Sequence, residues 1–360
     1  MPDTYTSQFS GEEIDSALRA AQIISGASTL AELRKKLEIR GDTIPVSAED
    51  STLISEALTK IPTTSGGGVN PNLLDNWYFG NPVNQRGQTE YTAAGYTVDR
   101  WKLSQWNTDE VAAKLKKTGL NISGSAEGKA NSTYIEENID FPFAGKTVTF
   151  SAIISEINKN SNTLSLFLRA NNTLLHSCPI KSTGLVSTTY TFANDFDGIV
   201  GFEIGQGGSE GGSGSCDFTI IAAKLELGDT QTLAHKENEK WVLNEIPDFG
   251  EQLRRCQRFY RRWTGADNKP LGVAVRRESK LLELVFSLDT TMRVAPSLTF
   301  NGSFVCVPAF TWCSVTSIDV ATPDTVAIFL KPNDDVTFDL DAYQINIANA
   351  NEYIALSADL

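Results

Sequence analysis

Between residues 70 and 230, apolar side chains recur at every second position, and this period constrains the fold more than any other feature. A strand requires it because successive side chains point to opposite faces of a sheet. The clearest runs place on one face Val148, Phe150, Ala152 and Ile154, and later Leu164, Leu166 and Leu168. Polar and glycine-rich turns at 158–162 and 205–214 separate the runs. The pattern predicts an antiparallel β-sandwich of jelly-roll type over residues 70–230.

After residue 230 the pattern starts again with a helical span within residues 245–263. In that span Leu253 and Cys256 share a face with Phe259 or Tyr260, and Pro247 suits the first turn. Strand-like runs follow at 271–275, 281–288, 297–300, 315–320, 325–330, 343–348 and 352–357. We therefore predict a second antiparallel β-sandwich over residues 231–360, with the helix as its connection to the first.

Residues 1–61 show a helical period instead, with capping boxes at Ser10 and Glu13 and at Thr29 and Glu32. The apolar stripes include Ile14, Leu18, Leu30, Leu33, Leu37, Ile54 and Leu58. Such short, narrow helices offer little core of their own. They predict either an attachment and oligomerisation segment or a three-helix cap folded onto its own neighbour. Three consecutive glycines within residues 62–69 predict a linker.

The composition of the 360-residue chain excludes several classes of partner. A net charge of −13 and the absence of a long basic patch oppose binding to nucleic acid. No run approaches the roughly 20 apolar residues that span a bilayer, and the start lacks the pattern of a secretory signal. We expect synthesis in a cytoplasm without membrane insertion. Five cysteines without a CxxC pair predict buried thiols rather than a disulfide framework.

Residues for catalysis or metal binding are sparse. The two histidines lack a neighbouring ligand or a carboxylate at ligand spacing. Two acidic groups could bind calcium or act as acid and base, or be solvated loops: Glu136, Glu137 and Asp140, and Asp334, Asp335, Asp339 and Asp341. We predict no enzyme activity, no catalytic residue, no metal and no cofactor.

Aromatic and polar residues near the start of the sandwich suggest where a sugar could bind, because pyranose faces stack on aromatic rings. We expect Trp77 and Trp101 to be core residues and Trp106 to be the exposed ring. The loop that contains Arg86 offers a guanidinium for an acidic sugar, or is a solvated turn. The glycan-binding candidates are Trp106, Gln85, Arg86, Asn107 and Asp109.

Four short segments occur in a fixed order: NLLDNWYF (72–79), GYTVDRW (95–101), AAKLELG (222–228) and LRRCQRFY (253–260). The segments at 72–80 and 220–228 look like the first and last strands of the sandwich. This ordered set resembles phage and prophage tail-fibre and receptor-binding proteins over about residues 70–300. Their first β-domain is similar to jelly-roll carbohydrate-binding modules. The resemblance implies a homotrimer that is attached to the virion by its N-terminus and binds host cell-surface polysaccharide.

The leading hypothesis is therefore a phage virion fibre, a tail or head appendage that serves in host cell attachment. Its partners would be copies of itself, other virion proteins at the N-terminal segment, and host glycans. Weak sugar contacts multiplied by avidity would suffice, so no deep site is required. The alternatives are a purely structural head fibre or adaptor protein, and a fibre-borne glycan depolymerase.

Overall fold

The computed structural model describes residues 69–126, 130–159, 164–171, 173–207, 212–265, 269–349 and 351–359. Pro71–Leu360 form one compact unit. The helical segment predicted at 1–61, with its oligomerisation residues, and positions 62–68 of the predicted linker lie outside the described residues. In the part of the chain that is described, no helix is long and apolar enough to cross a membrane.

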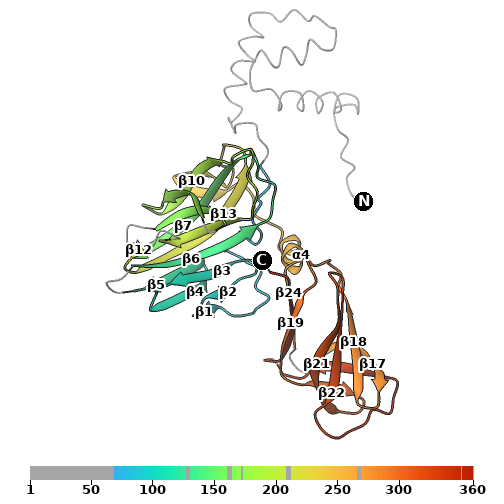
Figure 1. Ribbon diagram of the computed structural model, residues 1–360. Helices are drawn as coiled ribbons and strands as arrows, with labels where there is room; N and C mark the ends of the chain where they lie inside the picture. Colours follow the sequence, from blue (N-terminus) through green and yellow to red (C-terminus); the bar gives the residue numbers. More distant parts are fainter. Residues whose placement is uncertain are drawn as a thin grey trace, which may run out of the picture. The chain divides into compact units, whose positions relative to one another are not determined.

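The first β domain consists of two antiparallel sheets that face each other (Figure 1). Sheet 1 has the order β1 (Glu90–Tyr91), β4 (Glu110–Lys116), β5 (Gly119–Ser125), β13 (Cys216–Leu227), β7 (Thr147–Lys159) and β10 (Gly184–Thr191). Sheet 2 has the order β2 (Gly95–Tyr96), β3 (Lys102–Trp106), β6 (Ala130–Ile139), β11 (Val200–Gln206), β8 (Leu164–Ala170) and β9 (Thr173–Pro179), with β12 (Gly212–Ser213) paired to β6. The mainly β, antiparallel fold class predicted from the sequence is confirmed.

The apolar side chains that the sequence places at every second position face the space between the two sheets. Both predicted stripes are buried, from Val148 to Ile154 on β7 and from Leu164 to Leu168 on β8. The Phe202 ring of sheet 2 packs edge-to-face on Phe150 and on Trp101, with ring centroids 6.0 and 6.3 Å apart. Each such pair contributes about 0.5–1.5 kcal/mol beyond the area that it buries. Trp77 and Trp101 are both buried, so their prediction as core residues is confirmed.

The segment at 72–80 lies beside β13, but it is an irregular extended segment rather than a strand. Its backbone bonds to β13 are intermittent, from Phe79 N to Ile221 O at 2.8 Å and from Ala223 N to Trp77 O at 3.0 Å. The Asn72 carboxamide replaces further backbone bonds by donating to Ala223 O. A left-handed residue, Asn76 at φ 52°, then breaks the ladder. Side-chain bonding of this kind explains why a strand pattern yields an irregular edge.

A hairpin and a helix follow the sandwich. The hairpin pairs β14 (Ala234–Glu237) with β15 (Lys240–Leu243), and the helix is α4 (Phe249–Gln257). The predicted helical span is thus confirmed in its centre. The Asp248 side chain caps it by accepting from Glu251 N at 2.8 Å, so Pro247 lies just before the cap rather than in the first turn.

From Tyr260 onward the described residues form nine further strands, and they too pair antiparallel. Six close into a barrel in the order β17 (Lys269–Glu278), β18 (Leu281–Ser287), β22 (Thr325–Pro332), β21 (Thr311–Ala321), β20 (Phe304–Val307) and β23 (Ala342–Ile347). The other three form a sheet in the order β16 (Tyr260–Thr264), β24 (Tyr353–Ser357) and β19 (Ser297–Asn301). The barrel closes because β23 pairs with both β17 and β20. Closure removes the free sheet edges that a separate second sandwich would keep.

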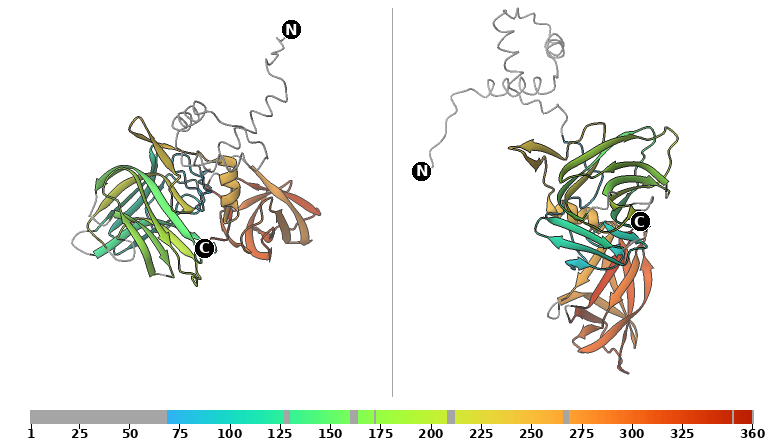
Figure 2. Two further views of the ribbon diagram at one scale, coloured as in Figure 1. Left: turned by 90° about the horizontal axis from the view of Figure 1, so that it is seen from above. Right: turned by 90° about the vertical axis from the view of Figure 1, so that its left-hand side faces the viewer.

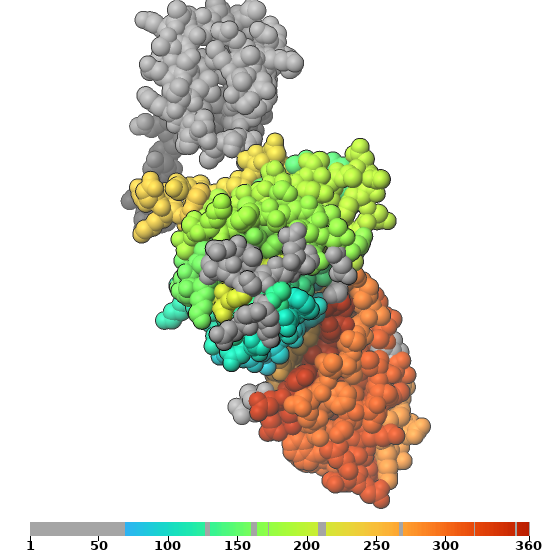
Figure 3. All heavy atoms as spheres, turned by 60° about the vertical axis from the view of Figure 1, so that its left-hand side comes forward, coloured from blue at the N-terminus to red at the C-terminus, as the bar shows by residue number. Residues whose placement is uncertain are grey.

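Figure 2 shows α4 between the sandwich and the barrel, and Figure 3 shows the sandwich, in blue to yellow-green, lying against the orange to red strands that follow. Charged and aromatic side chains join the two parts. We call this contact the sandwich–barrel junction. It comprises Asp75, Asn76, Gln85, Arg86, Asp99 and Arg100 of the sandwich, and Gln252, Arg255, Phe259, Tyr260 and Asp359 beyond it.

Arg86 is at the centre of the junction. Its guanidinium pairs with Asp99 at 3.1 Å and with Asp359 at 3.0 Å. It also lies 3.8 Å from the ring centroid of Tyr260 and 5.0 Å from that of Tyr96. Burial raises the pKa of the fully buried Asp99 to about 6, against the opposing effect of Arg86. A buried charge that is paired and stacked in this way holds a defined geometry.

Candidate functional site

Gln85 and Arg86, which the sequence suggested as glycan-binding residues, are engaged within the protein. The Gln85 amide donates to Asp99 Oδ2 and to Tyr260 O, both at 2.7 Å. The Arg86 guanidinium already makes two ion pairs and lies over two tyrosine rings, and 13% of the side chain is exposed. The loop is therefore neither a solvated turn nor a free anion clamp. We assign both residues to the sandwich–barrel junction, because their polar groups already have protein partners.

Trp106 and its neighbours lie in the β3–β4 connection. The Trp106 side chain is 58% exposed. Asn107 adopts φ 53° and donates from Nδ2 to Ala130 O at 2.6 Å, so it shapes the turn. Asp109 anchors the start of β4 by donating its backbone N–H to Ser125 O at 2.8 Å. Of these three residues, Trp106 presents the largest exposed apolar surface to a ligand.

The outer face of sheet 2 carries a polar hollow of about 600 Å³, which we call the sheet-face groove. Its lining residues are Ala94, Lys102, Ser104, Gln105, Tyr134, Glu136, Asn138, Arg169, Ala170, Asn171, Ile199, Gly201 and Glu203. On β3 the buried Leu103 faces the core, so Lys102 and Ser104 on either side face outward. Trp106 continues the same alternation and is on the same face of β3, two residues beyond the groove residue Ser104.

The strand register brings the groove residues together across the sheet. Ser104 is opposite Tyr134 on β6, and Glu136 is opposite Glu203 on β11. A Cβ at Gly205 would stand 2.4 Å from the Tyr134 Cβ, so glycine there leaves room for the tyrosine. An aromatic ring, a hydroxyl and two carboxylates from three strands therefore share one surface.

The electrostatics of the groove centre on Glu203. It is 2% exposed and pairs with Arg169 at 3.1 Å through Oε1. Burial raises the pKa of Glu203 to about 7, with Arg169 opposing the shift and Glu136 adding to it. Its Oε2 is buried and has no hydrogen-bond partner among the described residues. A buried oxygen in that state is costly, so a proton or a donor from a ligand would stabilise it.

Glu136 has a different environment from the carboxylate that it faces. It accepts a hydrogen bond of 2.5 Å from the Ser104 hydroxyl, and Lys102 Nζ lies 3.8 Å away. Like charges directly opposite each other on neighbouring strands repel. The groove thus offers one carboxylate with a polar partner and one that is readily protonated, beside the rings of Tyr134 and Trp106.

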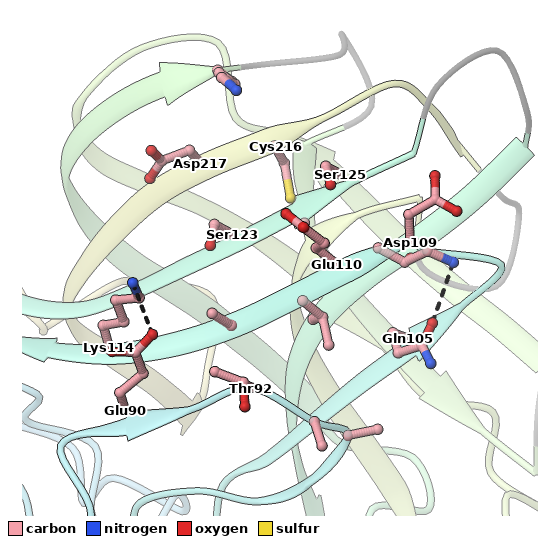
Figure 4. Close-up of a pocket in the computed structure, with 17 residues that line it drawn as sticks. Glu90, Thr92, Gln105, Asp109, Glu110, Lys114, Ser123, Ser125, Cys216 and Asp217 are labelled. Carbon is pink, nitrogen blue, oxygen red and sulfur yellow. Dashed lines mark hydrogen bonds and ion pairs between the residues drawn. The ribbon is translucent and has the colours of Figure 1, made fainter.

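Figure 4 shows a second hollow of about 750 Å³, lined by residues of β1, β3, β4, β5, β7 and β13 and by residues 92–94, 108 and 109. Glu90 and Lys114 form an ion pair of 2.9 Å within it. Asp109 lines it, whereas Trp106 is among the lining residues of neither hollow. Burial raises the pKa of the Cys216 thiol in its wall to about 12, so that thiol is a poor nucleophile. No aromatic ring lines this hollow, which makes it less suited to a sugar than the sheet-face groove.

The acidic groups considered for catalysis or calcium are divided by the fold. Glu136 and Glu137 are adjacent in sequence, but they point to opposite faces of β6, and Glu137 is buried against Arg100. Asp335 pairs with Lys280 and Asp341 with Arg276. Within the described ranges no three such side chains are grouped to hold a metal ion.

The five cysteines are unpaired in the structure. Four of them are buried, as predicted, and Cys178 is partly exposed. Burial raises the pKa of the Cys178 thiol, so it too is mostly protonated near neutral pH.

No family model and no curated protein matches this chain. Among solved structures it is similar to a family 4 carbohydrate-binding module, with 15% identity, covering 43% of this chain and 99% of that one, at a TM-score of 0.29. It is also similar to the tandem CBM22-1–CBM22-2 domain of Paenibacillus barcinonensis Xyn10C, with 8% identity, 82% and 92% coverage and a TM-score of 0.25. At such low TM-scores these similarities carry no argument about the site.

Proposed function

We propose that this protein is a phage virion fibre that binds neutral host-surface glycans at the sheet-face groove. The observation that carries the binding site is the groove itself, which hydroxyl, carboxylate and guanidinium groups line, with the exposed Trp106 on the same face of β3 two residues beyond Ser104. Sugars are bound by this combination, because a ring stacks on the pyranose face while polar groups meet its hydroxyls. The fibre assignment rests on the resemblance of the four ordered segments to tail-fibre proteins.

We also propose that the groove binds glycans without cleaving them. Glycosidases hold two carboxyl groups on either side of the scissile bond, where both reach the substrate. Glu136 and Glu203 face each other, but Glu203 is buried, and Arg169, whose side chain is only 13% exposed, holds one of its oxygens. It is therefore placed to stabilise the groove rather than to protonate a leaving group.

Affinity electrophoresis of the full chain in gels that contain xylan, laminarin or dextran tests the proposal. We expect slower migration in at least one gel, and loss of that retardation in Trp106→Ala. Trp312→Ala is the matched control, because Trp312 is a tryptophan of the barrel that is 40% exposed. Unretarded migration in every gel, with adsorption of the particle through another protein, would favour the structural head fibre or adaptor.

Weak sites become effective when several are linked, so the proposal includes a homotrimer. Sedimentation equilibrium of the full chain is expected to give three times the chain mass. A stable monomer at micromolar concentration would remove the avidity on which host attachment depends.

A further inference from the structure

A third hollow, of about 260 Å³, lies where the sandwich meets α4, and we call it the junction pocket. Its lining residues are Leu73, Asp75, Arg100, Glu137, Ile139, Asp140, Arg255, Arg258, Phe259 and Arg293. Four arginines and three carboxylates therefore share one small space. Cations in a confined, partly desolvated site interact strongly with any anion that enters it.

Two of the four arginines are neutralised by the protein. Asp75 pairs with Arg255 at 2.6 Å and with Arg100 at 3.3 Å. Glu137 pairs with Arg100 at 3.3 Å and accepts from Asp75 N at 3.1 Å. The Arg100 guanidinium also lies 3.6 Å from the centroid of the Phe259 ring. Asp75 and Glu137 are thus paired with Arg100 and Arg255, and neither forms an ion pair with Arg258 or Arg293 within the described residues.

Arg258 and Arg293 have no such partners. Their backbones are joined, because Arg293 N donates to Arg258 O at 2.7 Å. Neither side chain makes an ion pair or a hydrogen bond with the part of the chain that is described. Arg293 Nε is buried without a partner, although a guanidinium offers five donors. A buried donor without an acceptor costs free energy that an incoming anion would recover.

Asp140 is the one carboxylate of the pocket that could neutralise these arginines from within the protein. It is exposed and makes no ion pair within 4 Å among the described residues. Its charge opposes an anion at the pocket mouth. Removing that charge should therefore strengthen anion binding.

We propose that the junction pocket binds an oxyanion group, a carboxylate, phosphate or sulfate carried on a surface polymer, between Arg258 and Arg293. Arginine suits this chemistry because its planar donors match two oxygens of such a group. The pocket volume exceeds that of one oxyanion, so the sugar that carries the group fits as well. The assignment is independent of the sheet-face groove, whose residues it does not share.

Titration calorimetry of the full chain with polygalacturonate, neutral dextran and inorganic phosphate tests the proposal. We expect polygalacturonate to bind, and Arg293→Gln or Arg258→Gln to weaken it about tenfold, since a charge-assisted contact is lost. Asp140→Asn is expected to strengthen it. Arg254→Gln is the matched control, because it removes one positive charge from the same helix outside the pocket.

Two results would overturn the assignment. One is equal polygalacturonate affinity in wild type, Arg293→Gln and Arg258→Gln with unchanged melting temperatures. The other is binding of phosphate without binding of polygalacturonate, which would assign the pocket to a free anion. Retention of a neutral polysaccharide by the groove is a separate readout, so failure of one site leaves the other measurable.

Discussion

The sandwich–barrel junction and the sheet-face groove both contain a buried carboxylate beside an arginine, but only Asp99 of the junction has partners for both of its oxygens. At the junction Asp99 is held by Arg86 and by the Gln85 amide. In the groove Glu203 also has an arginine, yet one of its oxygens has no partner among the described residues. The partners of Asp99 hold it in one geometry, whereas Glu203 Oε2 can still accept a hydrogen bond from a ligand.

Of the four ordered segments at 72–79, 95–101, 222–228 and 253–260, three contribute to the junction and none lines the groove. Asp75, Arg100 and Arg255 come from three of the four segments, and they meet in one ion-pair network at the junction. The fourth segment contributes the β13 backbone to which the Asn72 carboxamide bonds. The segments therefore define how the first domain is closed and joined to the next, whereas the groove residues lie outside them.

The largest effect should come from breaking the junction at Arg86. Arg86→Ala leaves Asp99 buried without its cation and removes the stacking on Tyr260. Loss of one partner of a buried pair costs about 3–5 kcal/mol in the free energy of unfolding. Urea denaturation of the full chain would measure this loss. Glycan affinity of the folded variant should be unchanged. Reduced affinity with unchanged stability would instead assign Arg86 to the glycan-binding site.

The second-largest effect is the pH dependence of stability, which should differ between variants of the buried carboxylates Glu203 and Asp99. Burial raises the pKa of Glu203 from 4.5 to about 7, so the folded protein binds the extra proton. Its contribution to stability is present below pH 4.5 and is lost as pH rises through 7, by about 3 kcal/mol. Glu203→Gln should flatten this fall and match or exceed the wild type at pH 8. Urea midpoints between pH 4.5 and 8 would show it.

Asp99 supplies the contrast in the same pH series. Its pKa is also raised by burial, to about 6, so it adds a fall in stability between about pH 4 and 6. Asp99→Asn should nevertheless destabilise the protein at pH 8, because Arg86 loses one of its two carboxylate partners. An equal response of the two variants would mean that the groove carboxylate is as fully paired as the junction carboxylate.

The sequence predicted those features of the fold that depend on the two-residue alternation of apolar side chains along a strand. The alternation around Phe150 and the burial of Trp101 follow from side chains facing one interior. The irregular edge at Asn76 was missed, because carboxamide bonds and a positive φ override strand propensity there. Barrel closure was missed as well, since it depends on β23 pairing with a strand far away in sequence.

The groove was largely invisible in the sequence. Glu136 was noticed beside Glu137, whereas its partner across the sheet is Glu203, which only the strand register identifies. Trp106 could be found because an indole among polar residues at a turn stands out. A signal for the rest existed in the alternation of β6, which separates the outward Tyr134 and Glu136 from the inward Glu137.

A smaller effect is expected at the edge of the groove. Trp106→Ala should weaken binding of a retained neutral polysaccharide about tenfold, which corresponds to roughly 1.4 kcal/mol, without changing the urea midpoint. The ring is exposed and packs against no part of the core cluster. A loss of stability similar to that of Arg86→Ala would instead identify Trp106 as a structural residue.

The smallest effect tests whether burial, rather than distance, sets the strength of the junction. Arg254 lies 2.9 Å from Glu251 on α4, slightly closer than Arg86 lies to Asp99. Its side chain is 64% exposed, however, against 13% for Arg86, and water and salt screen an exposed pair. Arg254→Ala should leave the urea midpoint unchanged at low and high salt. A midpoint shift as large as that of Arg86→Ala would show that burial does not increase the contribution of the junction ion pairs to stability.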